Sequence, residues 1–183
     1  FSDAAITHHS AFEAFGYANQ VFYEVYVATD YRFRDFEYNG ILYHRMERNA
    51  YTDMVTNGKL RVTGIEQTIV DSIKDFTKIA GLEEVIRCIM LVPSVKEEKI
   101  LEALSVYDNK FLYQKCGYIL EQLQDELGLS NDFFEYLSRY TAEGKRYLIK
   151  ENGQNVWNLK WKIYVPADFM HLVDKGVSDY DAI

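Results

Sequence analysis

The sequence has little proline, little cysteine and no long hydrophobic run. Only 2 prolines and 10 glycines occur among 183 residues, which excludes collagen-like and proline-rich architectures. The 2 cysteines, Cys88 and Cys116, lie in segments with helical spacing, so we expect reduced, buried thiols and a cytoplasmic protein. No stretch of 18 apolar residues predicts a membrane span, and no signal-peptide pattern is present.

Basic residues are also in deficit. The chain has 20 Lys and Arg against 28 Asp and Glu, giving a formal net charge of −8, which argues against electrostatic DNA binding by the chain as a whole. Hydrophobic residues make up 48%, which excludes an extended disordered chain and predicts one domain with a sizeable core. The first residue is Phe1 rather than Met, so we expect an N-terminal part to be missing from this sequence.

The first part of the chain, residues 1–63, has the pattern of a helix followed by strands. Apolar residues at helical spacing predict a helix over His8–Phe15 that ends at Gly16. Residues 22–28 are β-branched and aromatic, as strands are. Asn-Gly pairs at 39–40 and 57–58, each between strand-like segments, predict two hairpins. Together these patterns predict an antiparallel β meander.

Residues 64–143 have the 3.6-residue period of helices, and residues 144–183 form a tail of different character. After a helix that starts near residue 65, we predict further helices over residues 82–92, 96–107, 109–127 and 130–140. Ser94 and Glu97 predict a capping box. In the tail, residues 156–165 predict one strand, and Pro166 predicts the start of a short helix over 167–173. The expected fold class is α+β, a meander packed on a helical bundle with a strand–helix tail.

The motifs of common catalytic and metal sites are missing from the sequence. It contains no HExxH, CxxC, GxGxxG, GxxxxGK[ST] or GxSxG pattern, so we expect no catalytic residue, metal or cofactor. Glu37, Glu47 and Asp53 resemble surface carboxylates of hairpins more than a nuclease site. A nuclease-like or nucleotide-processing enzyme remains the alternative.

Two basic groups interleave with aromatic residues and are candidates for binding nucleic acid or another partner. The first comprises Arg32, Arg34, Arg45 and Arg48, and the second comprises Lys145, Arg146, Lys160 and Lys162, near Trp157 and Trp161. The same pattern is typical of an ordinary half-buried hairpin, and the sequence leaves both interpretations open.

Three segments together resemble the C-terminal domain of AbiEi-family antitoxins. Residues 6–16 (ITHHSAFEAFG) resemble the family's SHxSALxxHG opening, and residues 61–71 (RVTGIEQTIVD) resemble its RVTxxERTxxD motif. Residues 81–84 and 115–121 fit the pattern GGLEE…GYLLE. The motif positions carried over are His9, Ser10, Glu66, Gln67, Thr68 and Asp71. Gln67 stands where the family usually has Arg. If the family's Arg–Asp pair is structural, Asp71 needs another partner here, and if the pair is functional, its loss affects activity.

The resemblance implies a function in bacterial abortive infection. Members of this family are antitoxins and transcriptional regulators of type IV toxin–antitoxin operons. It implies a nucleotidyltransferase-like toxin, or the target of that toxin, as functional partner, and promoter DNA bound through an N-terminal winged helix–turn–helix domain that this sequence lacks. An RNA- or protein-binding module is a further alternative. Thr63 is a plausible N-cap and Glu66 lies in the first helical turn, so the second motif fits a helix docked on the sheet better than a functional site.

Overall fold

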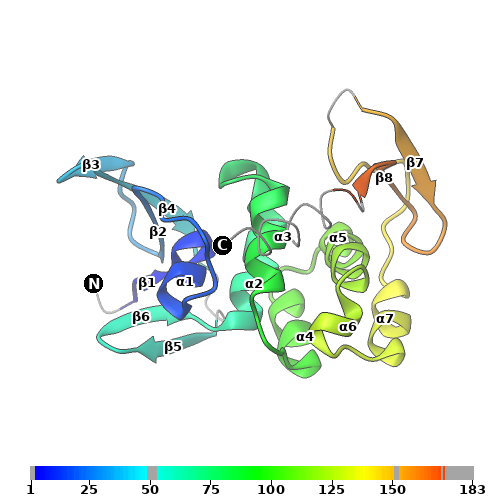
Figure 1. The fold of residues 1–183 in the computed structure, drawn as a ribbon, viewed down its shortest axis with the longest axis horizontal. Helices are drawn as coiled ribbons and strands as arrows, with labels where there is room; N and C mark the ends of the chain where they lie inside the picture. The colour runs from blue at the N-terminus through cyan, green and yellow to red at the C-terminus, as the bar shows by residue number, and fades with distance from the viewer. Residues whose placement is uncertain (1–2, 49–52, 151–152, 170, 172–183) are drawn as a thin grey trace.

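The computed structural model describes residues 3–48, 53–150, 153–169 and 171. It has the expected α+β fold, with a sheet at one end and a layer of helices at the other (Figure 1). The strands of the main sheet are β1 (Ala5–Ile6), β2 (Glu24–Thr29), β3 (Phe36–Tyr38), β4 (Ile41–Glu47), β5 (Met54–Asn57) and β6 (Leu60–Thr63). The helices are α1 (His8–Phe15), α2 (Ile65–Asp75), α3 (Leu82–Met90), α4 (Glu97–Ser105), α5 (Lys110–Glu121), α6 (Gln124–Leu127) and α7 (Asn131–Ser138). Within the described residues, no helix is both long and apolar enough to cross a bilayer.

The strand connectivity differs from the predicted antiparallel meander. The sheet is mixed, with the order β3-β4-β2-β1-β6-β5 and with parallel pairs β2–β4 and β1–β6. After β2 the chain passes outward to the edge, and β4 returns between β3 and β2. The short strand β1 then joins the two halves of the sheet, since Ile6 lies opposite Val27 on one side and Val62 on the other.

Both predicted hairpins are confirmed, and they occupy opposite edges of the sheet. At the β3–β4 turn Asn39 has φ 52° and Gly40 has φ 77°, the left-handed conformations that a tight hairpin turn of this kind requires. At the β5–β6 turn Gly58 has φ 60°. The local turns were therefore predictable, whereas the order of the strands was not.

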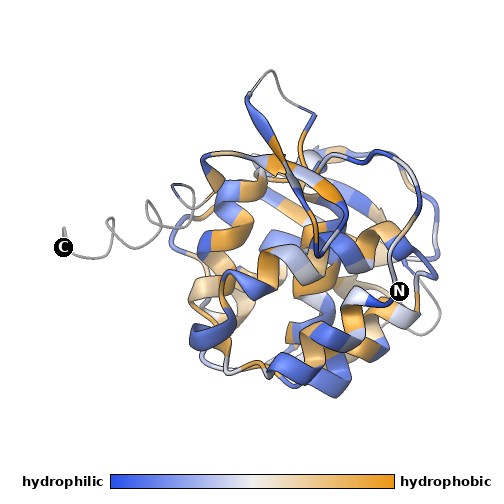
Figure 2. Ribbon diagram, turned by 90° about the vertical axis from the view of Figure 1, so that its right-hand side faces the viewer, coloured by the Kyte–Doolittle hydropathy of each residue, from blue (hydrophilic) through white to orange (hydrophobic). Residues whose placement is uncertain are grey.

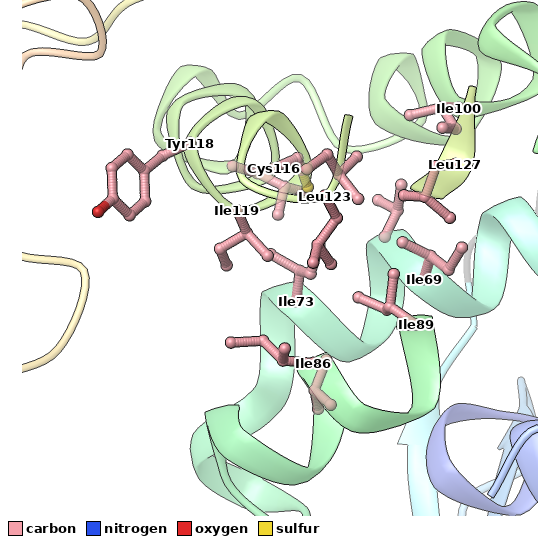
Figure 3. Close-up of a cluster of buried hydrophobic side chains, with 14 of the residues drawn as sticks. Ile69, Ile73, Ile86, Ile89, Ile100, Cys116, Tyr118, Ile119, Leu123 and Leu127 are labelled. Atoms are coloured by element: carbon pink, nitrogen blue, oxygen red, sulfur yellow. The ribbon is translucent and has the colours of Figure 1, made fainter. Parts of the chain in front are cut away.

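Helices α1 and α2 connect the sheet to the helical layer. Helix α1 ends at Gly16 in the left-handed conformation, as predicted, and packs on α2 and on β2 and β6. Helix α2 begins after Gly64, so Thr63 is not its N-cap. Ile69 and Ile73 of α2 face the helical layer, where they meet Ile86 and Ile89 of α3 (Figure 3). The helices carry both hydrophilic and hydrophobic residues, as amphipathic helices do (Figure 2).

Caps explain where several helices of this layer begin. The Asn109 side chain accepts hydrogen bonds from the first turn of α5, and the Ser130 side chain accepts one from the backbone N–H of Phe133 in α7. The predicted capping box at Ser94 is wrong, because α4 begins only at Glu97. Its first turn is held instead by Glu66 of α2, whose carboxylate accepts a hydrogen bond of 2.9 Å from the backbone N–H of Lys96.

The tail forms a hairpin rather than the single predicted strand. Its two strands are β7 (Asn155–Asn158) and β8 (Ile163–Pro166). The turn between them inserts Trp161 into the core, where it is fully buried against α5. A Cβ atom at Gly117 would come within 2.1 Å of the Trp161 ring, so glycine permits this close approach. Pro166 is the last residue of β8, so the helix does not begin there as predicted. Within the predicted range 167–173, Ala167 and Asp168 form a turn, Phe169 and His171 are helical, and residues 170, 172 and 173 lie outside the described residues.

Candidate functional site

The motif residues of α2 meet a side chain of the helical layer. Oδ1 of Asp71 accepts hydrogen bonds from Gln67 Nε2 at 2.7 Å and from the Tyr107 hydroxyl at 2.5 Å. Burial raises the pKa of Asp71, against the hydrogen bonds and the nearby positive charges. Gln67 therefore supplies a hydrogen-bond partner for Asp71 at the position where the AbiEi-family motif has arginine, and both side chains are buried rather than exposed.

Asp75, one turn further along α2, lies beside two lysines and a histidine. Its carboxylate accepts hydrogen bonds from Lys74 at 2.6 Å and Lys78 at 2.7 Å, and the His8 ring lies 3.5 Å away. Burial alone would raise the pKa of Asp75, but these contacts outweigh burial and hold it well below its usual range. His8 adopts a positive φ of 54°, a strained conformation for a non-glycine residue.

Motif residues Ser10 and Thr68 fasten α1 and α2 to the sheet. The Ser10 hydroxyl accepts a hydrogen bond from the Tyr26 N–H and donates one to the Glu24 carbonyl. It therefore pairs with backbone groups of β2 that lie beyond the end of the short strand β1. The Thr68 hydroxyl lies 2.7 Å from that of Thr63 and donates to the Thr63 carbonyl. Together with Glu66 at α4, these contacts support the interpretation that the second motif docks a helix on its neighbours.

His9 lies between two carboxylates from different helices. Its Nε2 is 3.1 Å from Oε1 of Glu84, and its Nδ1 is 3.0 Å from Oε1 of Glu13. Glu84 and Cys88 both belong to α3, and the Cys88 thiol donates to Glu84 at 3.6 Å. His9, Glu84 and Cys88 place donor atoms within 4.8 Å of one another, and no other metal-competent trio occurs in the described part of the chain.

Sequence reasoning did not find this trio. His9 and Glu84 are separated by 75 positions, so no local spacing brings them together. Their positions in two of the motif segments, residues 6–16 and 81–84, were the available hint. Cys116 is also fully buried, and burial raises its pKa to about 12, as expected for a thiol in the core.

Of the first basic group, Arg45 and Arg48 are occupied by internal contacts. Arg45 donates hydrogen bonds to the carbonyls of Tyr31 and Thr29, which fixes the chain that leaves β2. Arg48 donates to the carbonyl of Asp3 and lies 3.5 Å from the Asp30 carboxylate. Both arginines therefore shape the sheet edge instead of facing a partner.

Arg32 and Arg34 are exposed in the segment between β2 and β3, and neither has an ion-pair partner among the residues that the structure describes. Beside them lies a cavity of about 310 Å³ with an apolar, mostly aromatic wall. Its lining residues are Ala4, Val27, Thr29, Tyr31, Phe33, Phe36 and Tyr43. Phe36 stacks on Tyr43 with ring centroids 4.9 Å apart and remains 48% exposed. We call this cavity with Arg32 and Arg34 the sheet-edge surface.

Most residues of the second basic group make contacts within the chain. Lys160 pairs with Glu121 and lies over the rings of Phe134 and Trp161. Lys162 donates to the Thr141 hydroxyl at 3.3 Å. The Arg146 guanidinium lies 5.2 Å from the centroid of the Phe111 ring, while Lys145 is exposed. Three of the four residues therefore contact the helical layer beneath them.

The carboxylates considered for a nuclease site do not converge. Glu37 of β3 lies opposite Leu42 of β4. Glu47 lies on β4 itself, five positions after Leu42, and pairs with Thr29 of β2. At roughly 3.3 Å per residue, the two are about 16 Å apart along the strand. Asp53 precedes β5 at the far edge and pairs with Lys99 at 3.1 Å.

No protein-family model matches the chain, and no curated protein matches it. Among solved structures, the crystal structure of the RV2827C protein from Mycobacterium tuberculosis is similar in fold, with a TM-score of 0.65 and 14% sequence identity. The match covers 97% of this chain, and this chain spans 66% of that protein. At this identity the likeness concerns the fold alone.

Proposed function

We propose that the chain is the recognition domain of an antitoxin-type transcriptional regulator and acts by binding rather than by catalysis. The observation that carries this proposal is the sheet-edge surface, an aromatic cavity of about 310 Å³ beside Arg32 and Arg34. Exposed aromatic side chains and arginine are the residues that contribute most energy at protein interfaces. The resemblance of residues 6–16 and 61–71 to AbiEi-family motifs supports the antitoxin class.

The partner in this proposal is a nucleotidyltransferase-like toxin, which would insert an apolar side chain into the cavity and place acidic groups near the two arginines. Promoter binding would belong to a winged helix–turn–helix domain outside this sequence. The acidic balance of the chain, −8 overall, fits a division in which DNA affinity lies elsewhere.

The experiment compares Phe36→Ser with Tyr136→Ser, a matched change at an exposed aromatic residue of α7. Each is co-expressed with the product of the adjacent gene, which this proposal identifies as the toxin, and growth and complex formation are measured. We expect Phe36→Ser to weaken the complex by about 2 kcal/mol, roughly thirtyfold in Kd, and to restore toxicity, while Tyr136→Ser behaves as the wild type. Equal neutralisation by both variants would exclude the sheet-edge surface, and no neutralisation by the wild-type chain would exclude the antitoxin function.

The same surface favours a second candidate, the binding of single-stranded RNA. Arg32 and Arg34 lack ion-pair partners among the described residues and stand beside Tyr31 and Phe33, an arrangement suited to phosphate contacts and base stacking. Joint replacement of both arginines by Ala should then abolish RNA binding and reduce its dependence on salt. RNA binding that survives this change would rule the candidate out.

A further inference from the structure

The buried trio of His9, Glu84 and Cys88 has the geometry of a metal site. Glu84 and Cys88 are four residues apart on α3, so they share one face of that helix, and His9 reaches them from α1. The Nε2–Oε1 distance is 3.1 Å and the Sγ–Oε1 distance is 3.6 Å. In tetrahedral zinc sites, bond lengths of about 2.0–2.3 Å place neighbouring ligand atoms roughly 3.3–3.8 Å apart.

A neutral imidazole cannot satisfy both carboxylates that face His9. If its proton is on Nε2 and donated to Glu84, the buried Nδ1 is left without a hydrogen bond, although Oε1 of Glu13 lies 3.0 Å away. His9 is only 2% exposed, so water does not resolve this conflict easily. A metal ion on Nε2 would place the ring proton on Nδ1, 3.0 Å from Oε1 of Glu13.

The charges around the trio are mainly negative. Two carboxylates, Glu13 and Glu84, approach a largely buried space, and the nearest opposing charge is Arg87, whose Nη1 lies 3.9 Å from Glu84. A divalent cation would offset this negative charge and would favour the thiolate.

We propose that His9, Glu84 and Cys88 bind a zinc ion, with Glu13 orienting the His9 ring from its other nitrogen. One thiolate, one imidazole and one carboxylate form a donor set typical of zinc. A carboxylate behind a ligating histidine is the usual supporting contact. On binding, the thiol proton leaves to solvent and the imidazole proton occupies Nδ1, so one proton is released for each ion bound.

The trio borders an open cavity through one of its residues. Glu84 also lines an open cavity of about 300 Å³, whose other lining residues are Gln20, Phe22, Ala80, Glu83 and Arg87. The ion would connect α1, which packs on the sheet, with α3 in the helical layer. Zinc would therefore stabilise the contact between the two parts of the fold, independently of the sheet-edge surface.

The test is titration of the purified, reduced, metal-free chain with Co²⁺, followed by competition with Zn²⁺. We expect one ion per chain, a thiolate-to-cobalt charge-transfer band, visible absorption typical of tetrahedral cobalt and displacement of the cobalt by zinc. Thermal unfolding measured in parallel should shift to higher temperature with Zn²⁺. No bound ion, or an ion without the thiolate band, would overturn the proposal.

Cysteine variants provide the matched control, because both thiols are buried in helices. Cys88→Ala should abolish the charge-transfer band and weaken zinc binding at least tenfold, whereas Cys116→Ala should retain both. His9→Gln tests the second ligand and should lose the tetrahedral spectrum. Circular dichroism checks that each variant is folded, and a folded Cys88→Ala variant that keeps the band would refute the site as assigned.

Discussion

The sheet end and the helical end of the molecule are buried in different ways. The sheet end contains most of the buried polar side chains. Among the described residues, all of the buried polar side chains lie within positions 7–75, except Glu84 and Gln114. The helical end is packed with apolar side chains, mainly isoleucine, leucine, valine and aromatic residues, as Figure 3 shows for the cluster around Ile73 and Ile119. Helix α2 takes part in both, because Ile69 and Ile73 face the helices while Thr68 and Asp71 contact polar partners.

This difference teaches that the two ends depend on different forces. Apolar packing stabilises the helical end strongly, and such a core tolerates exchange between apolar side chains of similar size. The hydrogen-bonded end gains less from each contact, but every unsatisfied group there is costly. The hydrogen bonds of the sheet end, called the polar end below, therefore fix the positions of α1 and α2. Mutations at the two ends should differ in how much they lower the free energy of unfolding.

Loss of a large apolar side chain from the helical end should have the greatest effect. Trp161→Ala removes a fully buried ring that packs against Gly117 and whose Nε1 donates to Glu121 at 2.6 Å. We expect a loss of about 3–5 kcal/mol in the free energy of unfolding, measured by urea denaturation. Trp157→Ala is the control, since Trp157 is 44% exposed, and an equal loss in both would contradict the assigned packing.

Loss of one hydrogen bond from the polar end should cost less. Tyr107→Phe keeps the ring but removes the hydroxyl that donates to buried Asp71. We expect a loss of about 1–3 kcal/mol in the same denaturation experiment. The control is Tyr147→Phe at an exposed ring of the tail, and indistinguishable stabilities of the two variants would show that the Asp71 contact is unimportant.

The acids of α2 should give the polar end a pH dependence. The pKa of Asp75 is lowered by the fold, so its contribution is complete above the unfolded value near 3.8 and is lost as pH falls toward the folded value. The pKa of Asp71 is raised, so its ionisation destabilises the fold at neutral pH. Asp75→Asn should therefore flatten the fall in stability below about pH 4.

Thermal melts from acid to neutral pH measure this effect. Asp71→Asn serves as the contrasting variant, because it should remove a gain in stability on acidification rather than a loss. Parallel curves for Asp75→Asn and the wild type at low pH would show that the Lys74 and Lys78 contacts do not depress the pKa.

The smallest effect on stability is expected at the sheet-edge surface. Arg32→Ala and Arg34→Ala remove exposed side chains from the segment between β2 and β3, so each should change the free energy of unfolding by no more than about 0.5 kcal/mol. Urea denaturation again provides the measurement. A larger loss would mean that these arginines support the fold, and would weaken their assignment to partner binding.

The sequence predicted the features that depend on a few neighbouring residues. Gly16 and Gly128 end helices in left-handed conformations, and Asn109 and Ser130 begin them, all for local reasons. The α+β class followed from the change of period near residue 64. Strand order did not follow, because the two-residue strand β1 has no pattern of its own and yet determines how the halves of the sheet meet.

For the candidate sites, prediction succeeded in part. Arg32 and Arg34 were identified as basic residues beside aromatics, whereas their exposure and the partners of Arg45 and Arg48 depend on the folded sheet. Gln67 was recognised as a departure, whereas its hydrogen bond to Asp71 required the folded helix. His9 and Cys88 were interpreted separately, since only the packing of α1 on α3 brings them together.

The central position of β1 has a consequence for the order of folding. Its contact with β6 joins Ile6 to Val62, and such distant pairing carries a loop-closure cost that the helix pairs of residues 82–138 largely avoid. The helical end, including the apolar face of α2, should therefore fold early. Closure of the sheet by β1 is then the late event, and it completes the surface on which Phe36 and the two arginines are displayed.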